Sequence, residues 1–177
     1  MSIAPDELTR FLRRVRQIRD YQPEPVPDDV LVDILEVGRW SGSASNRQTS
    51  EVVVVRDPGA RQVLASGGAS MAARAGAVLV LVTQGDPERQ ELEIFDEGRM
   101  AERLLLAATA RGLGSAIATL KGDGRAAAKQ LLGIPAERRV KTVVAVGVAD
   151  RAAIRARPKN PQPRKPLDQY AHWDRYD

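Results

Sequence analysis

A polar loop between residues 41 and 50 carries the side chains best suited to bind a planar ligand. Its hydroxyl and amide residues are Ser41, Ser43, Ser45, Asn46, Gln48, Thr49 and Ser50. Asn and Gln each present an acceptor and two donors on one flat group, which can pair with the edge of a heterocycle. A much shorter turn would connect the flanking elements, so the length of the loop favours a binding role. Because Ser, Asn and Gly are also ordinary turn residues, a capped turn is the alternative interpretation.

Basic residues gather near both ends of the chain. The pair Arg16 and Arg19, with Gln17 between them, would share one face of a helix and could clamp a phosphate group. A solvated basic helix end is the alternative. The pI of about 9.7 keeps a nucleic-acid-binding module open, although 4% aromatic residues argue against a base-stacking surface. The clusters are Arg13, Arg14, Arg16 and Arg19, and Arg155, Arg157, Lys159, Arg164 and Lys165.

Several kinds of catalytic site are excluded by composition. The chain has no cysteine and one histidine, His172, which is predicted to be a surface residue. Thiolate metal sites, disulfides, cysteine nucleophiles and histidine-based triads therefore do not fit. The acidic pair Asp96 and Glu97 is predicted to lie on a solvated helix face rather than to act as acid and base. Without a signal peptide or a membrane-spanning apolar run, we expect a soluble cytoplasmic protein with no metal and no membrane partner.

A glycine-rich stretch at residues 122–127 fits the dinucleotide pattern G-x-G-x-x-A, after a strand and at the start of a helix. Lys121 and Asp123 flank its first glycine, and a dinucleotide-binding unit usually begins a domain rather than ending one. We therefore favour a plain glycine-rich turn here.

Apolar spacing predicts the elements that position these residues. Helices are predicted at residues 7–19, 28–39, from Pro58 to the pair Gly67-Gly68, 93–111 and 125–132. Strands are predicted at residues 52–55, 77–83, 115–120 and 140–148. The alternation of strands and helices predicts one layered α/β domain, with a mixed sheet of four to five strands that includes parallel pairs.

Two proline-rich segments interrupt this pattern. The first, at residues 22–27, must be extended because each proline disfavours helix at the preceding residue. The second is the tail, where Pro158, Pro161, Pro163 and Pro166 oppose regular helix. The tail cannot form a core of its own, yet it carries Tyr170, Trp173 and Tyr176. Large aromatic side chains are costly to expose, so we expect the tail to dock on a partner.

Five short motifs occur in order along the chain. They are V-R-Q-I-R-D-Y at residues 15–21, followed by Pro25-Val26; G-S-A-S-N-R-Q-T-S at 42–50; an aliphatic helix ending in G-L-G-S at 112–115; L-G-I-P at 132–135; and R-K-P-L at 164–167. In these motifs the chain resembles the nitroreductase family of FMN-dependent oxidoreductases. The resemblance covers nearly the whole chain, and the motifs are specific in combination rather than singly.

The resemblance implies an α+β fold of nitroreductase type that forms a tail-exchanging homodimer with FMN at the subunit interface. Residues 1–150 would form the FMN-binding domain, and residues 151–177 would wrap around the partner. Arg16, Gln17, Arg19 and Arg164 would hold the phosphate and ribityl end of FMN. Backbone groups near Ala118, Thr119 and Leu120 would approach the N5 edge of the flavin. The isoalloxazine ring would face the loop residues Gly42, Ser43, Ala44, Asn46 and Gln48, some of them contributed by the other subunit.

The activity implied is hydride transfer from NAD(P)H through FMN to a small organic acceptor, such as a nitroaromatic or a quinone, by a ping-pong cycle. The flavin carries this chemistry, so no catalytic side chain and no nucleic acid are expected. The chain departs from the family motifs at Val15, Gln17, Gly42, Thr49 and Ser50. These departures keep a second function open, a flavin-binding or storage protein without turnover.

Overall fold

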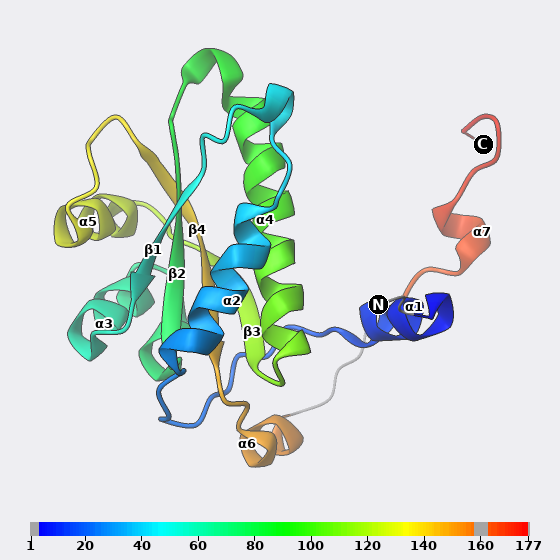
Figure 1. The fold of residues 1–177 in the computed structure, drawn as a ribbon, viewed down its shortest axis with the longest axis horizontal. Helices are drawn as coiled ribbons and strands as arrows, with labels where there is room; N and C mark the ends of the chain where they lie inside the picture. Colours follow the sequence, from blue (N-terminus) through cyan, green and yellow to red (C-terminus); the bar gives the residue numbers. More distant parts are fainter. Residues whose placement is uncertain (1–3, 158–162, 177) are drawn as a thin grey trace.

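A four-stranded sheet lies between two layers of helices in the computed structural model, which describes residues 4–157 and 163–176 (Figure 1). Helices α2 and α4 cover one face of the sheet, and α3, α5 and a 3-10 turn, η2, cover the other. The strands, in the spatial order β1-β2-β4-β3, are β1 (Glu51–Val55), β2 (Ala77–Thr83), β4 (Arg139–Gly147) and β3 (Gly114–Thr119).

The helices in the described ranges differ widely in length and in how much of their surface is covered. The α-helices are α1 (Pro5–Arg14), α2 (Asp28–Arg39), α3 (Pro58–Ser66), α4 (Gln90–Ala110), α5 (Asp123–Leu132), α6 (Arg151–Ala156) and α7 (Leu167–Tyr170). Short 3-10 turns are η1 (Ala44–Asn46), η2 (Ser70–Arg74) and η3 (Pro87–Arg89). None of the helices in these ranges has the length and apolar character needed to cross a bilayer.

Each neighbouring pair of strands in the described sheet is antiparallel. The layered α+β architecture and the four-strand count agree with the sequence-based prediction, but the expected parallel pairs are wrong. All seven residues of β2 are buried, because helices cover both faces of the sheet. Continuous apolar strands usually indicate a parallel sheet for that reason. Here the same burial is reached with antiparallel pairing, so strand composition did not reveal direction.

Packing between neighbouring helices depends on close approach at two glycines. A Cβ on Gly38 of α2 would lie 2.6 Å from Leu104 Cδ2 of α4, and a Cβ on Gly124 of α5 would lie 2.4 Å from Gly67 Cα. Gly124 belongs to the glycine-rich stretch at residues 122–127. Its role in the structure is to let the start of α5 pack on the end of α3, which supports the interpretation as a turn rather than a dinucleotide site.

The predicted ends of several helices are confirmed. Asp57 caps α3, because its Oδ2 accepts a hydrogen bond of 2.7 Å from the Ala60 amide. Gly112 after α4 and Gly133 after α5 have φ values of 76° and 64°, the left-handed region that favours glycine at a helix end. The apolar periodicity therefore located the helices of the body well.

The N-terminal helix is shorter than predicted. It ends at Arg14 rather than at residue 19, and residues 15–20 continue without helical structure toward the sheet. The Ile18 amide donates to the Ser115 carbonyl of β3 at 2.8 Å, so tertiary hydrogen bonding replaces the last turns of the helix. Arg16 and Arg19 consequently do not share a helix face, and that part of the prediction is wrong.

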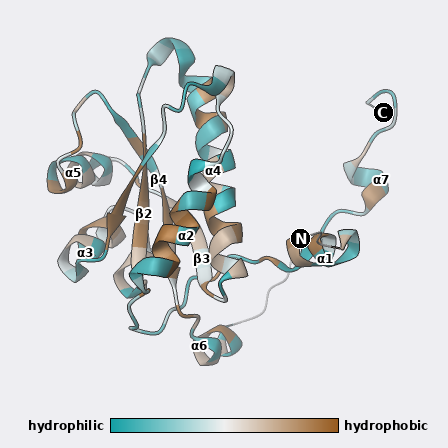
Figure 2. Cartoon of the chain, viewed as in Figure 1, coloured by the Kyte–Doolittle hydropathy of each residue, from teal (hydrophilic) through white to brown (hydrophobic). Residues whose placement is uncertain are grey.

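The two ends of the chain project from the body. Figure 1 places α1 and α7 on the same side, away from the sheet, and Figure 2 shows apolar residues on both of these outlying helices. The tail begins with a helix that the sequence analysis did not predict, α6, which precedes the prolines. The Asp150 carboxylate caps this helix, because it accepts hydrogen bonds from the Ala152 and Ala153 amides at 3.1 and 2.9 Å. Pro158, Lys159 and Pro161 lie outside the described residues.

Candidate functional site

The segment at residues 16–19 lies along the open edge of β3. The side-chain oxygen of Gln17 accepts a hydrogen bond of 3.2 Å from the Ile117 amide of β3, and the Ile18 amide reaches Ser115 on the same edge. Tyr21 fixes the end of the segment, because its buried hydroxyl donates to the Ile18 carbonyl and, at 3.3 Å, to the Ala145 carbonyl. Burial raises the pKa of the Tyr21 hydroxyl, so it remains a donor.

Arg16 and Arg19 are exposed cations beside this edge. Arg16 Nη1 donates to the carbonyls of Arg13 and Val15, each at 2.7 Å, and Arg19 Nη2 donates to Gln17 Oε1 at 2.8 Å. Neither guanidinium forms an ion pair with a carboxylate in the described part of the chain. Their positive charge is thus left for an anion from outside the protomer.

The end of β3 offers backbone groups to the same edge. Successive residues of a strand direct their amide and carbonyl groups to opposite sides. Because Ser115 and Ile117 face the open edge, Thr119 faces it too. Leu120 follows the same alternation and faces β4, since its amide donates to the Lys141 carbonyl at 2.8 Å, while its own carbonyl accepts from Arg125 at 2.9 Å. Ala118 is half-buried.

The polar loop forms a tight structure around η1. Ser45, Asn46 and Gln48 have φ values of 53°, 52° and 52°, a region uncommon for residues other than glycine. Ser43 Oγ accepts a hydrogen bond of 2.9 Å from the Gln48 amide, and the Gln48 side chain donates to the Asn46 carbonyl at 3.4 Å. The loop is therefore more than a connection, because several backbone positions adopt costly conformations at once.

Asp96 on α4 anchors this loop to the helix. Its Oδ2 accepts a hydrogen bond of 2.8 Å from the Ala44 amide, and its other oxygen lies 3.6 Å from Arg99. Arg99 in turn packs on Gly42, where a Cβ would stand 2.6 Å from the Arg99 Nη2 atom. A larger residue at position 42 would displace only the end of the flexible Arg99 side chain, so packing does not require the glycine at this motif position.

The acidic pair on α4 is buried, which corrects the predicted solvated face. Asp96 is 6% exposed and Glu97 is 3% exposed. Glu97 holds the neighbouring strand, because it accepts from Arg139 at 2.6 Å and from the Thr142 amide at 3.2 Å. The helical spacing could have predicted the burial of Glu97, since Glu97 shares its helix face with the buried Ala101 and Leu104.

The two groups of predicted site residues lie on opposite edges of the sheet, and Gln17 meets β3 at Ile117, midway along the strand. The polar loop leads into Glu51 of β1, whereas Gln17 contacts β3. With the order β1-β2-β4-β3, three strand spacings separate the edges, roughly 14 Å. Arg164 lies in the exposed tail and, among the described residues, forms no hydrogen bond or ion pair with either group. One protomer therefore brings Gln17, Arg16 and Arg19 to β3, but does not bring them together with the loop.

Apolar side chains remain uncovered near both groups. Trp40 at the end of α2 is 69% exposed and Phe95 on α4 is 65% exposed. In the tail, Trp173 is 82% exposed and Tyr176 is 89% exposed, with the Tyr176 ring stacked on His172 at a centroid distance of 4.3 Å. Exposed apolar surface of this extent marks an association surface more often than a solvated one.

Comparison with known proteins identifies the family. The model of the nitroreductase family matches residues 12–66 and 59–148, which include the segment beside β3, the polar loop and all four strands. The chain belongs to the nitroreductase family. This nitroreductase-family chain is 29% identical over 205 residues to a protein named NADH dehydrogenase from Thermus thermophilus, covering 95% of the chain and 96% of that relative.

Solved structures share the fold of this nitroreductase-family chain. The NADPH:FMN oxidoreductase of Vibrio harveyi, in complex with NAD+, superposes with a TM-score of 0.78 at 27% identity, covering 96% of the chain and 77% of that structure. Nitroreductase A of Vibrio parahaemolyticus gives a TM-score of 0.82 at 25% identity, with 98% and 78% covered. An FMN-dependent nitroreductase of Clostridium difficile gives 0.78 at 22% identity, with 94% and 98% covered.

Proposed function

We propose that the protein is an FMN-dependent oxidoreductase of nitroreductase type, which uses NAD(P)H to reduce a small organic acceptor such as a nitroaromatic or a quinone. The observation that carries this proposal is the pair of arginines, Arg16 and Arg19, held without acidic partners against the open edge of β3. That segment lies inside the family match at residues 12–66. The names of two relatives, NADH dehydrogenase and NADPH:FMN oxidoreductase, agree with this reaction class.

The residues present fit the chemical parts of FMN. Guanidinium groups bind phosphate through two parallel hydrogen bonds, and Arg16 and Arg19 have charge available for this. Gln17 would serve the ribityl hydroxyls, because its amide group still has donors after its oxygen accepts from Ile117 and Arg19. The Thr119 amide on the open edge would donate to the flavin ring edge.

Bound FMN would supply hydride and electron transfer, so the chain needs no nucleophile of its own. The role of the protein is to bind, orient and stabilise charge. Arg19 beside the site would stabilise negative charge that develops on the reduced cofactor. The polar loop, fixed by Asp96, would present its amide and hydroxyl groups without reorganisation, which lowers the entropic cost of binding.

A homodimer would complete the site. Within one protomer the polar loop and the arginine segment lie on opposite sheet edges, so a second copy would bring its loop to the first copy's β3. In this arrangement residues 1–150 form the FMN-binding domain and residues 151–177 extend over the partner. Burial of Tyr170, Trp173 and Tyr176 in that contact would explain why a single chain leaves them exposed.

Absorption spectroscopy of the purified protein tests the proposal. We expect a yellow protein with a flavin spectrum that bleaches rapidly when NADH or NADPH is added without oxygen. Initial rates with varied nicotinamide and acceptor should give the parallel double-reciprocal lines of a ping-pong cycle. A colourless protein that does not bind added FMN contradicts the proposal. A yellow protein that neither nicotinamide bleaches would instead be a flavin-binding protein without turnover.

A further inference from the structure

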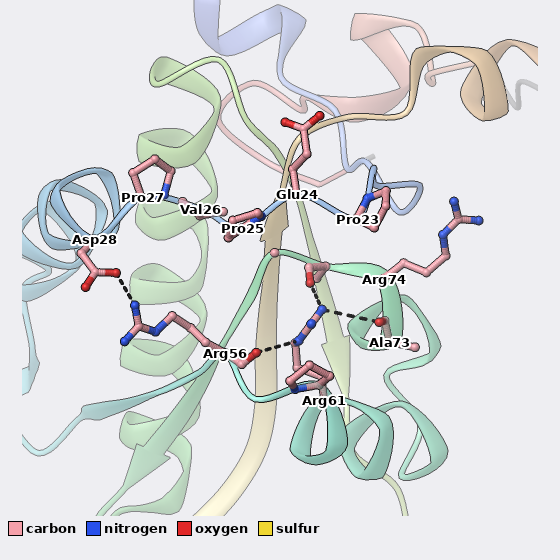
Figure 3. A pocket seen from close by; sticks show the side chains of 13 residues that line it. Pro23, Glu24, Pro25, Val26, Pro27, Asp28, Arg56, Arg61, Ala73 and Arg74 are labelled. Atoms are coloured by element: carbon pink, nitrogen blue, oxygen red, sulfur yellow. Dashed lines mark hydrogen bonds and ion pairs between the residues drawn. The ribbon is translucent and has the colours of Figure 1, made fainter.

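A cavity lies at the end of the sheet opposite the polar loop and Thr119. It has a volume of about 570 Å³ and opens between the extended segment before α2 and the turn η2 (Figure 3). β1 ends and β2 begins beside it, whereas the polar loop and Thr119 lie at the other ends of these strands. Its lining residues include Pro23, Pro25, Val26, Arg56, Arg61 and Arg74.

The wall of the cavity is rigid and largely apolar. Three prolines in five residues fix the backbone at Pro23, Pro25 and Pro27, because each ring locks its φ angle. Val26 is buried beneath them, and Gly76 packs so closely that a Cβ there would lie 2.6 Å from the Glu24 carbonyl oxygen. The cavity is thus preformed, and its proline rings offer flat surfaces to an apolar ligand.

Arg61 lies on the floor of the cavity, half-buried and fixed in one orientation. Its Nε donates to the Arg56 carbonyl at 3.2 Å, and its Nη1 donates to the carbonyls of Ala75 and, at 3.5 Å, Ala73 (Figure 3). These partners are neutral, and Arg61 forms no ion pair within residues 4–157 and 163–176. Its remaining nitrogen, Nη2, donates no hydrogen bond within the described residues, so its donors and the positive charge of Arg61 are available to a ligand.

Two further arginines flank Arg61, and the nearby acids offset them only in part. Arg56 is paired with Asp28 at one side of the cavity. Arg74 is exposed and lies 3.8 Å from Asp150, a distance longer than a hydrogen bond. The Glu24 side chain points away from the arginines in Figure 3. The floor of the cavity is therefore positive, while its roof is apolar.

We infer that this cavity binds a small organic anion with a flat apolar body, such as an aromatic carboxylate. The carboxylate would pair with Arg61 and Arg74, and the apolar body would lie against Pro23 and Pro25. The volume falls within the range of small-molecule pockets, ~300–1,000 Å³. The lining residues of this cavity are not those assigned to the flavin, and the polar loop and Thr119 lie at the other end of the sheet, so the inference does not depend on flavin binding.

Calorimetric titration of the purified protein with benzoate tests the inference, with benzamide as the uncharged isostere. We expect saturable benzoate binding that benzamide does not match and that leaves the flavin absorption spectrum unchanged. Arg61→Gln should weaken benzoate binding about ten- to hundredfold, the effect of losing a charged hydrogen-bond partner. Arg74→Gln should weaken it in the same direction, and Arg10→Gln on α1 should leave it unchanged.

Arg61→Lys guards against misfolding, because it keeps the charge at this position and loses only the planar fork. It should bind benzoate more weakly than the unmodified protein and more tightly than Arg61→Gln. If Arg61→Gln fails to fold by circular dichroism, Arg61→Lys and Arg74→Gln decide the question. Three results would overturn the inference. They are equal binding of benzoate and benzamide, no saturable binding at millimolar concentrations, and benzoate binding that perturbs the flavin spectrum and survives all three variants.

Discussion

The body of the protein and its two ends differ in how much of their apolar surface one chain can cover. In the body, β2 is completely buried, and Leu64 and Leu104 are inaccessible in the two helical layers. At the ends, α1 exposes Leu8 and Leu12, and the tail exposes a leucine and three aromatic side chains. One chain is therefore sufficient for the core, whereas its ends carry exposed apolar surface of the kind that association surfaces present.

The largest effect is expected from deleting residues 158–177. This truncation keeps α6, whose Arg157 pairs with Asp20 at 2.6 Å, and removes Tyr170, Trp173 and Tyr176. Docked aromatics of this size contribute on the order of 1.5–3 kcal/mol each, so the proposed dimer should dissociate. Flavin affinity should fall with it, while circular dichroism should report a folded body. A truncated protein that remains a dimer by light scattering and binds FMN normally would make the tail an appendage without a role in assembly.

The next largest effect is expected on FMN affinity, when one arginine near β3 and one arginine of the tail are replaced in turn. Arg16→Ala and Arg164→Ala should each weaken FMN binding about ten- to hundredfold, because each would lose a charged contact to phosphate. Flavin fluorescence titration measures both, and Arg10→Ala on α1 serves as the matched control. A loss in Arg16→Ala alone would show that the tail does not reach the phosphate, and a loss in neither would remove the phosphate role.

Adding one methyl group inside the body should affect folding without affecting assembly. Gly124→Ala places a Cβ against backbone atoms of Gly67, so the free energy of unfolding should fall by about 1–3 kcal/mol. Gly98→Ala on α4 meets no atom within 4 Å and should leave stability equal or higher. Urea denaturation measures both variants. An unchanged unfolding midpoint for Gly124→Ala would mean that the α3–α5 contact is looser than described.

The smallest effect concerns Glu36, which holds an exposed aromatic residue of the body in place. Its hydrogen bonds from Arg39 and Trp40 lower the pKa of Glu36 to about 2 from 4.5. Because the folded pKa is below the unfolded one, the stabilising contribution is complete above about pH 4.5 and is lost as the pH falls toward 2. In a Trp173→Phe background, Trp40 fluorescence should titrate near pH 2, and Glu36→Gln should abolish that step. A midpoint near 4.5 would indicate that Glu36 is unpaired in solution.

Apolar patterning was sufficient to predict most elements of the body, because burial and periodicity are both written in local sequence. The direction of the strands could not be predicted in this way, since β2 and β4 are buried on both faces whichever way they run. The end of α1 was also missed. Val15 continues the helical spacing of Leu8 and Leu12, but the hydrogen bond that the Ile18 amide donates to the distant Ser115 carbonyl, together with the burial of Tyr21, holds the chain extended there.

The residue types of the candidate site could be predicted from the sequence, but the contacts that hold those residues in place could not. The motif at residues 42–50 pointed to the loop, and the resemblance to the nitroreductase family assigned Gln17 to the site. The contact of Gln17 with β3 required the tertiary structure. Asp96 was assigned to a solvated face because early helical acids usually complement the helix dipole. Its burial beneath Ala44 follows from the loop folding over α4, which no local pattern specifies.

The strand order has a consequence for how the chain is made. β2 pairs with β1 as soon as both leave the ribosome, but its other edge waits for β4, which follows α4, β3 and α5 in the sequence. During that interval the emerging chain carries an apolar strand with one unpaired edge. Such edges recruit other strands, so slow or stalled translation after α4 exposes the nascent protein to aggregation. The same order means that the four-stranded sheet cannot be complete until β4, the last of its strands to be synthesised, lies between β2 and β3.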